Sequence, residues 1–190
     1  MKKKSQSNRD YSNNKLKSMI LSSLMCALIC IISPWTVPIG PVPISLSSFI
    51  IMLAAYILGF KGAVMATFLY LLIGLTGIPV FSGMRGGLAV ITGPTGGYLV
   101  GYLLLAYISG LFSEKFKRKK IYVFFGFLLG NICLYVLGTI YLSFVMNITF
   151  VKGLIIGVVP FIIPDMIKCF LAVLIGSSVV SSLNLNLNLK

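Results

Sequence analysis

The sequence predicts an all-α integral membrane protein with six transmembrane helices. Hydrophobic residues make up 58% of the 190 residues and charged residues 10%, and the mean hydropathy is +1.02. A soluble domain carries about 25% charged residues, so this chain has too few polar groups to cover a surface in water. Its basic residues stand in blocks at the ends of long apolar runs, the pattern of a protein embedded in a lipid bilayer rather than of one that binds nucleic acid.

The six helices follow from where the apolar runs are interrupted. No charged residue occurs from Ser18 to Phe60, a run long enough for two helices divided by a proline-rich loop. Lys61 and Gly62 predict a tight turn into the third helix, and a Gly-rich stretch separates the third helix from the fourth. The last apolar run is too long for one straight span of about 30 Å, so a short re-entrant or interfacial piece up to about Val159 is expected first. The helices are expected at about 16–33, 44–60, 62–78, 94–113, 121–146 and 160–183.

The basic residues also predict the orientation in the membrane. With six spans both termini lie on one side, and that side collects nearly all the Lys and Arg. Only Arg85, Lys152 and Lys168 lie elsewhere. The positive-inside rule therefore places both termini in the cytoplasm. We expect a basic cytoplasmic N-terminus (1–15), a transmembrane substrate-binding domain (16–183) and a cytoplasmic tail (184–190).

Few residues are available for catalysis. The chain has no His and three acidic residues, so the commonest general base is missing and carboxylate pairs are excluded. No catalytic residue, metal site or cofactor is expected. A membrane enzyme that uses Asp165 and Lys168 as acid and base is a weaker alternative, and a structural subunit without a ligand is another.

Asp165 and Lys168 carry the sharpest functional signal. They stand three residues apart in the last predicted helix and therefore share a face. Ionisable residues in a spanning segment are costly and mark functional sites by default. Together they offer acceptors and donors to a polar, neutral heterocycle such as a urea or amide. The structural alternatives are an ion pair that only ties the helix together, or a lysine that reaches the membrane interface.

Arg85 is the second candidate, in the Gly-rich stretch from Ser82 to Gly87. A guanidinium suits a carboxylate or phosphate, and the backbone of Gly86 and Gly87 permits close approach of a ligand. The alternative is an ordinary exposed arginine of a loop.

Three aromatic residues near the outer face, Trp35, Phe81 and Tyr98, are candidates to line a pocket. They equally suit an interfacial aromatic belt. In the first predicted helix, small residues that include Ser23 and Ala27 form either a packing face or a docking surface for another membrane subunit.

Taken together, these residues resemble the BioY family, the biotin-specific substrate-binding subunits (S components) of energy-coupling-factor (ECF) transporters. The resemblance covers nearly the whole chain. The stretches that carry it are Val42-Pro-Ile-Ser45, Gly77-Ile-Pro-Val-Phe81, Gly86-Gly87, Gly93-Pro-Thr-Gly-Gly-Tyr98 and Pro164-Asp-Met-Ile-Lys168.

The resemblance implies a subunit of the bacterial plasma membrane that captures biotin from outside. A transmembrane coupling subunit and two ATPase subunits would drive uptake, so this chain is not expected to be an enzyme itself. Asp165 and Lys168 would bind the ureido ring and Arg85 the carboxylate. The family's Ala-xxx-Ala docking pattern is replaced here by Ser23 and Ala27. An S component for another vitamin, such as riboflavin or thiamin, is the alternative.

Overall fold

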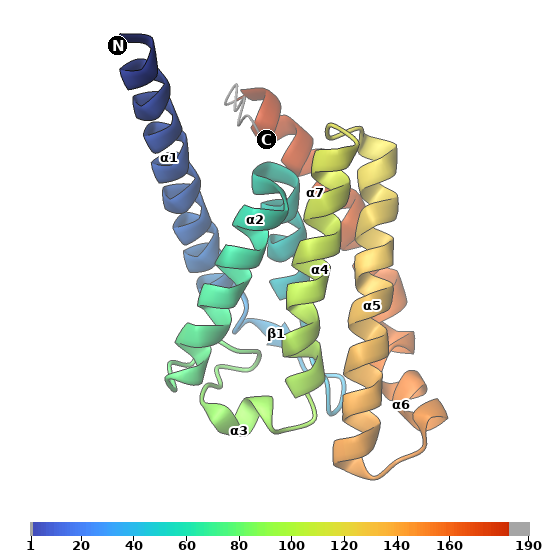
Figure 1. The fold of residues 1–190 in the computed structure, drawn as a ribbon. Coiled ribbons are helices and arrows are strands. Elements are labelled where there is room, and N and C mark those ends of the chain that lie inside the picture. Colours follow the sequence, from blue (N-terminus) through green and yellow to red (C-terminus); the bar gives the residue numbers. More distant parts are fainter. Residues whose placement is uncertain (1, 183–190) are drawn as a thin grey trace.

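The protein is a bundle of long helices capped at one end by short elements (Figure 1). The computed structural model describes residues 2–182, with side chains from Leu16 onward, so the predicted tail at 184–190 lies outside the described residues. The elements in chain order are α1 (Lys2–Ile32), β1 (Thr36–Val37), β2 (Ile44–Ser45), α2 (Ser47–Leu75), α3 (Leu88–Ile91), α4 (Gly96–Lys115), α5 (Lys120–Met146), α6 (Phe150–Gly157), the 3-10 turn η1 (Val159–Phe161) and α7 (Ile162–Ser182).

Helix α2 contains two of the predicted membrane segments, because the chain reverses direction at Gly59. This residue has φ 73° and ψ −170°, a conformation that glycine adopts without the steric cost of a Cβ atom. Ser47 in the first half and Tyr70 in the second both hydrogen-bond to the Ser33 hydroxyl, so the two halves run antiparallel (Figure 1). The predicted turn at Lys61 and Gly62 is therefore placed two to three residues too late.

Two charged residues hold this reversal, Glu114 at the end of α4 and Arg118 in the α4–α5 connection. The Glu114 carboxylate accepts a hydrogen bond from the Phe60 backbone amide (3.0 Å), at the start of the second half of α2. Arg118 donates to the carbonyls of Tyr56 (3.0 Å) and Ile57 (2.8 Å), at the end of the first half. Both charges match the helix dipole. Burial lowers the pKa of Arg118, against the opposing effects of Tyr56 and Glu114.

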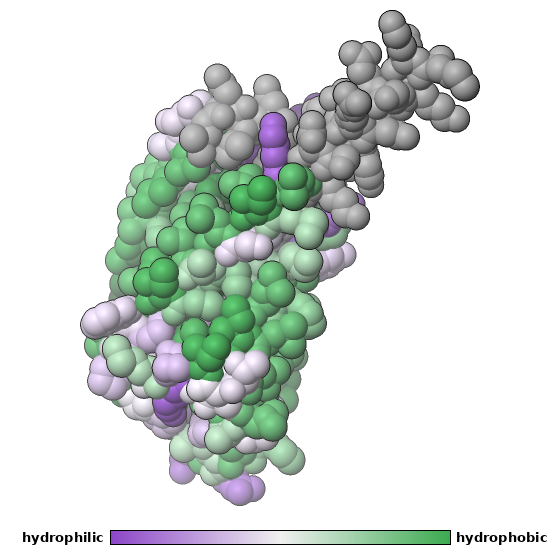
Figure 2. Space-filling view, turned by 90° about the vertical axis from the view of Figure 1, so that its left-hand side faces the viewer, coloured by the Kyte–Doolittle hydropathy of each residue, from purple (hydrophilic) through white to green (hydrophobic). Residues whose placement is uncertain are grey.

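The six predicted membrane segments are confirmed as α1, the two halves of α2, α4, α5 and α7. In the described part of the chain, four helical stretches have the length and composition to cross a membrane, and the shorter Leu16–Ile32 is also apolar. Many large hydrophobic side chains face outward, Phe144 with 80% of its surface exposed. Hydrophobic residues cover most of the lateral face in Figure 2. Such a surface fits a hydrocarbon environment and is incompatible with water.

The end of the bundle opposite the Gly59 reversal differs most from the prediction. The proline-rich segment forms an antiparallel hairpin that pairs Thr36 with Ser45 and Val37 with Ile44, where only a loop was expected. The Gly-rich stretch contains the short helix α3. The predicted re-entrant piece is helix α6, which begins at Phe150. These elements cover the ends of the long helices away from the Gly59 reversal (Figure 1).

Helix α4 packs closely on α5 through glycine. A Cβ atom on Gly97 would lie 2.4 Å from the Tyr141 Cβ, and one on Gly101 would lie 2.7 Å from a Leu134 methyl. The two glycines stand four residues apart, a spacing that lets two membrane helices approach closely. This packing brings Tyr98 and Tyr102 of α4 alongside Tyr135 of α5, where the cavity described next lies.

Candidate functional site

A small polar cavity lies beneath the hairpin, among α2, α4, α5 and α7. Its volume is about 40 Å³, room for a few water molecules. Ligand pockets usually measure roughly 300–1,000 Å³, so the cavity is much smaller than a typical ligand pocket. The lining residues are Val42, Pro43, Ser45, Ser48, Tyr98, Tyr102, Leu134, Tyr135, Phe161, Asp165 and Lys168.

Asp165 and Lys168 form a buried ion pair in the wall of this cavity. The Lys168 Nζ lies 2.6 Å from Asp165 Oδ1, and the two residues are 6% and 7% exposed. Their spacing in α7 predicted a shared face, and the structure confirms that placement. The first turn of α7 places them beside β2 and α5, away from the lipid-facing side of the bundle.

All three protons of the Lys168 ammonium have acceptors. Besides Asp165, Nζ donates to the Ser45 carbonyl at 2.6 Å and to the Ser48 hydroxyl at 3.4 Å. The bond to Ser48 is long for a charge-assisted hydrogen bond, which is normally 2.7–2.9 Å. It is therefore the contact that a ligand acceptor displaces at the lowest cost.

Tyr135 completes the environment of the carboxylate. Its hydroxyl donates to Asp165 Oδ2 at 2.6 Å. Each carboxylate oxygen has about two lone pairs, so both oxygens of Asp165 keep acceptor capacity that faces the cavity. Sequence reasoning missed Tyr135, Ser45 and Ser48, because no local spacing links them to Asp165. The sequence could have indicated Tyr102 as a lining residue, because it lies four residues from Tyr98 on the same face of α4.

Tyr98 is the aromatic candidate that lines the cavity. It is buried, and its hydroxyl donates to the Gly157 carbonyl at 2.9 Å. Its ring therefore forms part of the wall, while its polar end anchors α4 to the end of α6.

The Arg85 loop occupies a separate place, between α2 and α3. The exposed guanidinium donates from Nε to the Ser82 carbonyl at 3.2 Å. The Gly87 amide donates to the Gly74 carbonyl at 2.7 Å, and a Cβ atom on Gly86 would overlap the Ile78 carbonyl. Both glycines thus tie the loop to the end of α2, and the structure does not bring Arg85 into the cavity of Asp165.

Phe81 and Trp35 also lie outside the cavity lining. Phe81 is fully buried, with its ring edge-to-face on Tyr70 at 5.5 Å between centroids. Trp35 is 67% exposed, next to the start of the hairpin. The Gly83 amide donates to the Pro34 carbonyl at 3.1 Å, so the Arg85 loop contacts the base of the segment that covers the cavity.

The small residues of α1 face two ways. Ser22 and Cys26 are buried in the bundle, whereas Ser23 and Ala27 are exposed. The predicted single stripe is therefore divided, and the two residues expected to dock a partner lie on the outward face.

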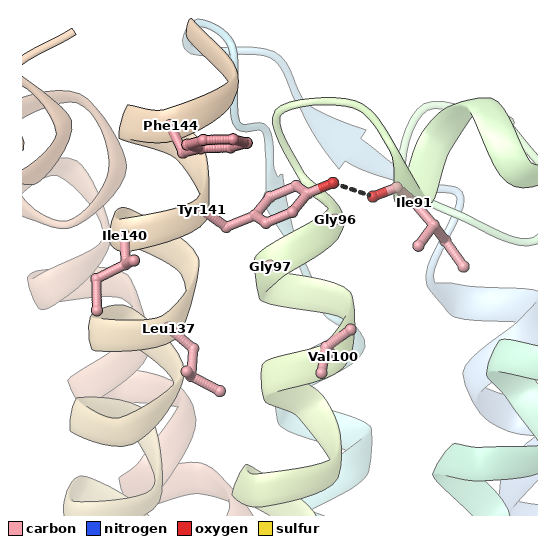
Figure 3. Close-up of a pocket in the computed structure, with 8 residues that line it drawn as sticks. All are labelled: Ile91, Gly96, Gly97, Val100, Leu137, Ile140, Tyr141 and Phe144. Carbon is pink, nitrogen blue, oxygen red and sulfur yellow. Dashed lines mark hydrogen bonds between the residues drawn. The ribbon is translucent and has the colours of Figure 1, made fainter. Parts of the chain in front are cut away.

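A larger cavity lies elsewhere and is almost entirely apolar. It measures about 380 Å³ between α3, α4 and α5. In Figure 3 the Tyr141 hydroxyl points toward Ile91, another lining residue, and donates to the Ile91 carbonyl at 3.1 Å. Its lining offers no ion pair to a polar ligand. Its lining residues are Ile91, Gly96, Gly97, Val100, Leu137, Ile140, Tyr141 and Phe144.

The fold and the cavity define a multi-pass α-helical membrane protein that encloses a buried ion pair suited to a small polar ligand. Comparison with known proteins gives the family. The BioY family model matches residues 1–185, and the chain belongs to the BioY family.

Two relatives match over almost their full length. Biotin transporter BioY2 of Lactococcus lactis is 35% identical over 172 residues, which cover 90% of this chain and 94% of the relative. Biotin transporter BioY of Thermotoga maritima is 38% identical, over 85% of this chain and 94% of the relative. A crystal structure of the S-component for biotin from an ECF-type ABC transporter matches with a TM-score of 0.83 and 36% identity. That match covers 89% of this chain and 93% of the other.

Proposed function

We propose that this protein is the biotin-binding S component of an ECF transporter, which captures biotin from outside the cell for ATP-driven uptake. The observation that carries the proposal is the buried Asp165–Lys168 pair in the wall of the covered cavity. The family membership and the biotin transporters among the relatives support the choice of biotin over another vitamin.

The ureido ring of biotin has two N–H donors and one carbonyl acceptor. Asp165 accepts from the ring N–H groups with the lone pairs that Tyr135 and Lys168 leave unused. Lys168 exchanges its long bond to Ser48 for the ureido carbonyl. A charge-assisted bond replaces a weak one, so recognition leaves neither charge unpaired inside the protein.

Biotin enters by displacement of the segment that covers the cavity. At about 40 Å³ the cavity is too small for the vitamin, and Val42 and Pro43 of the hairpin connection form part of its wall. Residues 37–41 of the hairpin are exposed, whereas Ser45, whose carbonyl accepts from Lys168, is buried. Movement of the connection up to Pro43, with Ser45 kept in place, enlarges the site without disturbing the ion pair.

The Arg85 loop is the proposed partner of the biotin carboxylate. The guanidinium is exposed and its loop contacts Pro34, at the base of the covering segment. Once that segment moves, Arg85 together with Ser82, Gly86, Gly87 and Trp35 forms the outer edge of the enlarged site. The Phe81 ring packs edge-to-face on Tyr70 and so anchors this loop to α2. The Tyr98 ring forms a wall of the inner part of the enlarged site.

The partners and the orientation complete the proposal. The exposed face of α1 with Ser23 and Ala27 docks a transmembrane coupling subunit, because small residues allow close approach of two helices. Two ATPase subunits supply the energy. The start of α1, the Gly59 reversal and the α4–α5 connection lie at one end of the bundle (Figure 1). Because lysines gather at that end, we propose that it faces the cytoplasm.

Calorimetric titration of the purified protein with biotin tests the function, and riboflavin and thiamin serve as comparison ligands. The parent chain is expected to bind biotin saturably. The double variant Asp165→Asn, Lys168→Met removes both charges and leaves no unpaired buried ion, so it is expected to fold and to lose binding. Absence of saturable biotin binding by the parent refutes the proposal, and unchanged affinity of the double variant refutes the site.

A further inference from the structure

A cluster of buried hydroxyl groups lies directly behind the ion pair and contacts the cavity through one residue. Ser33 follows α1, Ser45 is in β2, Ser47 begins α2, and Tyr70 is in the second half of α2. Ser33, Ser47 and Tyr70 are each 0% exposed. We call Ser33, Ser45 and Ser47 the hydroxyl ring, with Tyr70 as its outer donor.

One backbone carbonyl determines the direction of every hydrogen bond in this cluster. Ser45 Oγ donates to the Ser33 carbonyl at 3.3 Å, because a carbonyl oxygen can only accept. Since Ser45 has a single proton, Ser47 donates to Ser45 Oγ at 2.6 Å. By the same reasoning, Ser33 donates to Ser47 at 2.5 Å and Tyr70 donates to Ser33 at 2.6 Å. The ring closes through the backbone of Ser33, whose carbonyl accepts the last bond of the chain, and each of the three serine hydroxyl groups both donates and accepts.

Ser45 connects the ring to the ion pair. Its side chain belongs to the ring, and it also accepts at Oγ from the Ser47 amide at 3.1 Å. Its carbonyl accepts from Lys168 Nζ at 2.6 Å. The ring therefore fixes the position of one of the two short contacts that orient the Lys168 ammonium, the other being Asp165.

We infer that the hydroxyl ring and Tyr70 are positioning residues for ligand binding: they hold the Ser45 carbonyl against Lys168 and so keep the ammonium aimed at the cavity. This inference rests on the proposed function. With the ring intact, Lys168 gives up only its long contact to Ser48 when the ligand binds. With the ring broken, the Ser45 carbonyl is free to move. Ordering the Lys168 ammonium then subtracts from the free energy of ligand binding.

The test compares biotin affinity among variants that keep or remove ring hydroxyls. Tyr70→Phe removes the outer donor with almost no change in volume, and Ser47→Ala opens the ring. Each is expected to weaken binding about tenfold, the loss that follows from one hydrogen bond in a buried network. Ser47→Thr retains the hydroxyl and is expected to bind within about threefold of the parent.

Thr67→Val is the matched control. Thr67 is also 0% exposed, lies one turn before Tyr70, and donates to the Ala63 carbonyl at 2.8 Å without touching the ring. It is expected to lower the midpoint of thermal unfolding as Tyr70→Phe does, while its affinity for biotin stays that of the parent. The inference is overturned if Tyr70→Phe and Ser47→Ala bind like the parent, if Ser47→Thr binds no better than Ser47→Ala, or if Thr67→Val weakens binding equally. If the parent itself fails to bind biotin, the proposed function fails instead.

Discussion

Replacement of Tyr135 by Phe isolates the contribution of one hydroxyl to the binding site. The hydroxyl lies 2.6 Å from Asp165 Oδ2, while Lys168 holds Oδ1 at the same distance. Phe keeps the ring and removes only the donor. A hydrogen bond to a charged group contributes about 1.5–3 kcal/mol, and about 1.4 kcal/mol corresponds to a tenfold change in Kd. Because Lys168 still holds the carboxylate, we expect the lower end of this range, a Kd for biotin about tenfold higher.

Calorimetric titration of the purified protein measures this change, and Tyr141→Phe is its control. Tyr141 lies on the same helix and donates to the Ile91 carbonyl at 3.1 Å, outside the polar cavity. Its loss is expected to leave the Kd unchanged, although both variants lose one buried hydrogen bond. The reasoning is refuted if Tyr135→Phe binds as tightly as the parent, or if Tyr141→Phe weakens binding to the same extent.

Two further predictions concern the helix reversal and the docking face. Gly59→Ala is expected to lower the free energy of unfolding by about 1–3 kcal/mol, because its positive φ with ψ near 180° is a region that essentially only glycine adopts, with further loss from contact with the Glu114 carboxylate. Gly40→Ala, where a Cβ meets nothing within 4 Å, should have no such effect in the same thermal unfolding assay, and equal loss in both variants would contradict this role of Gly59. Ser23→Leu is expected to leave biotin binding unchanged but to reduce biotin uptake by cells about tenfold, because a large side chain prevents close helix contact. Val100→Leu, on the exposed side of α4, should reduce neither, and normal uptake by Ser23→Leu would exclude docking through this face.

The sequence was sufficient to predict the membrane segments and, in the candidate site, the Asp165–Lys168 pair and Tyr98. The length of an apolar run and the charges beside it can be read locally from the sequence, so α4, α5 and α7 lie close to the expected ranges. Helix α1 ends at Ile32, as expected, but it begins at Lys2 and not near residue 16. The spacing of Asp165 and Lys168 is also local, since both are on one helix. Tyr135 and Ser45 reach these residues only through tertiary packing, which no periodicity in the chain encodes. The hairpin was missed for the same reason: its two strands are two residues each, too short to give an alternating pattern.

Assigning charged residues to one side of the membrane also left a structural role of two of them, Glu114 and Arg118, unnoticed. Glu114 and Arg118 stand in the basic block that predicts the cytoplasmic side, and that role accounts for them without any further function. In the structure both turn inward and bond the backbone groups that the Gly59 reversal leaves without partners. The same physical requirement makes Asp165 and Lys168 pair at the opposite end of the bundle. Where helices end inside an apolar bundle, backbone groups and charges must satisfy one another, because neither lipid nor packed side chains replace water. A charged residue that topology already explains can therefore still be essential to the fold, and its position relative to a helix break, here Gly59, indicates when it is.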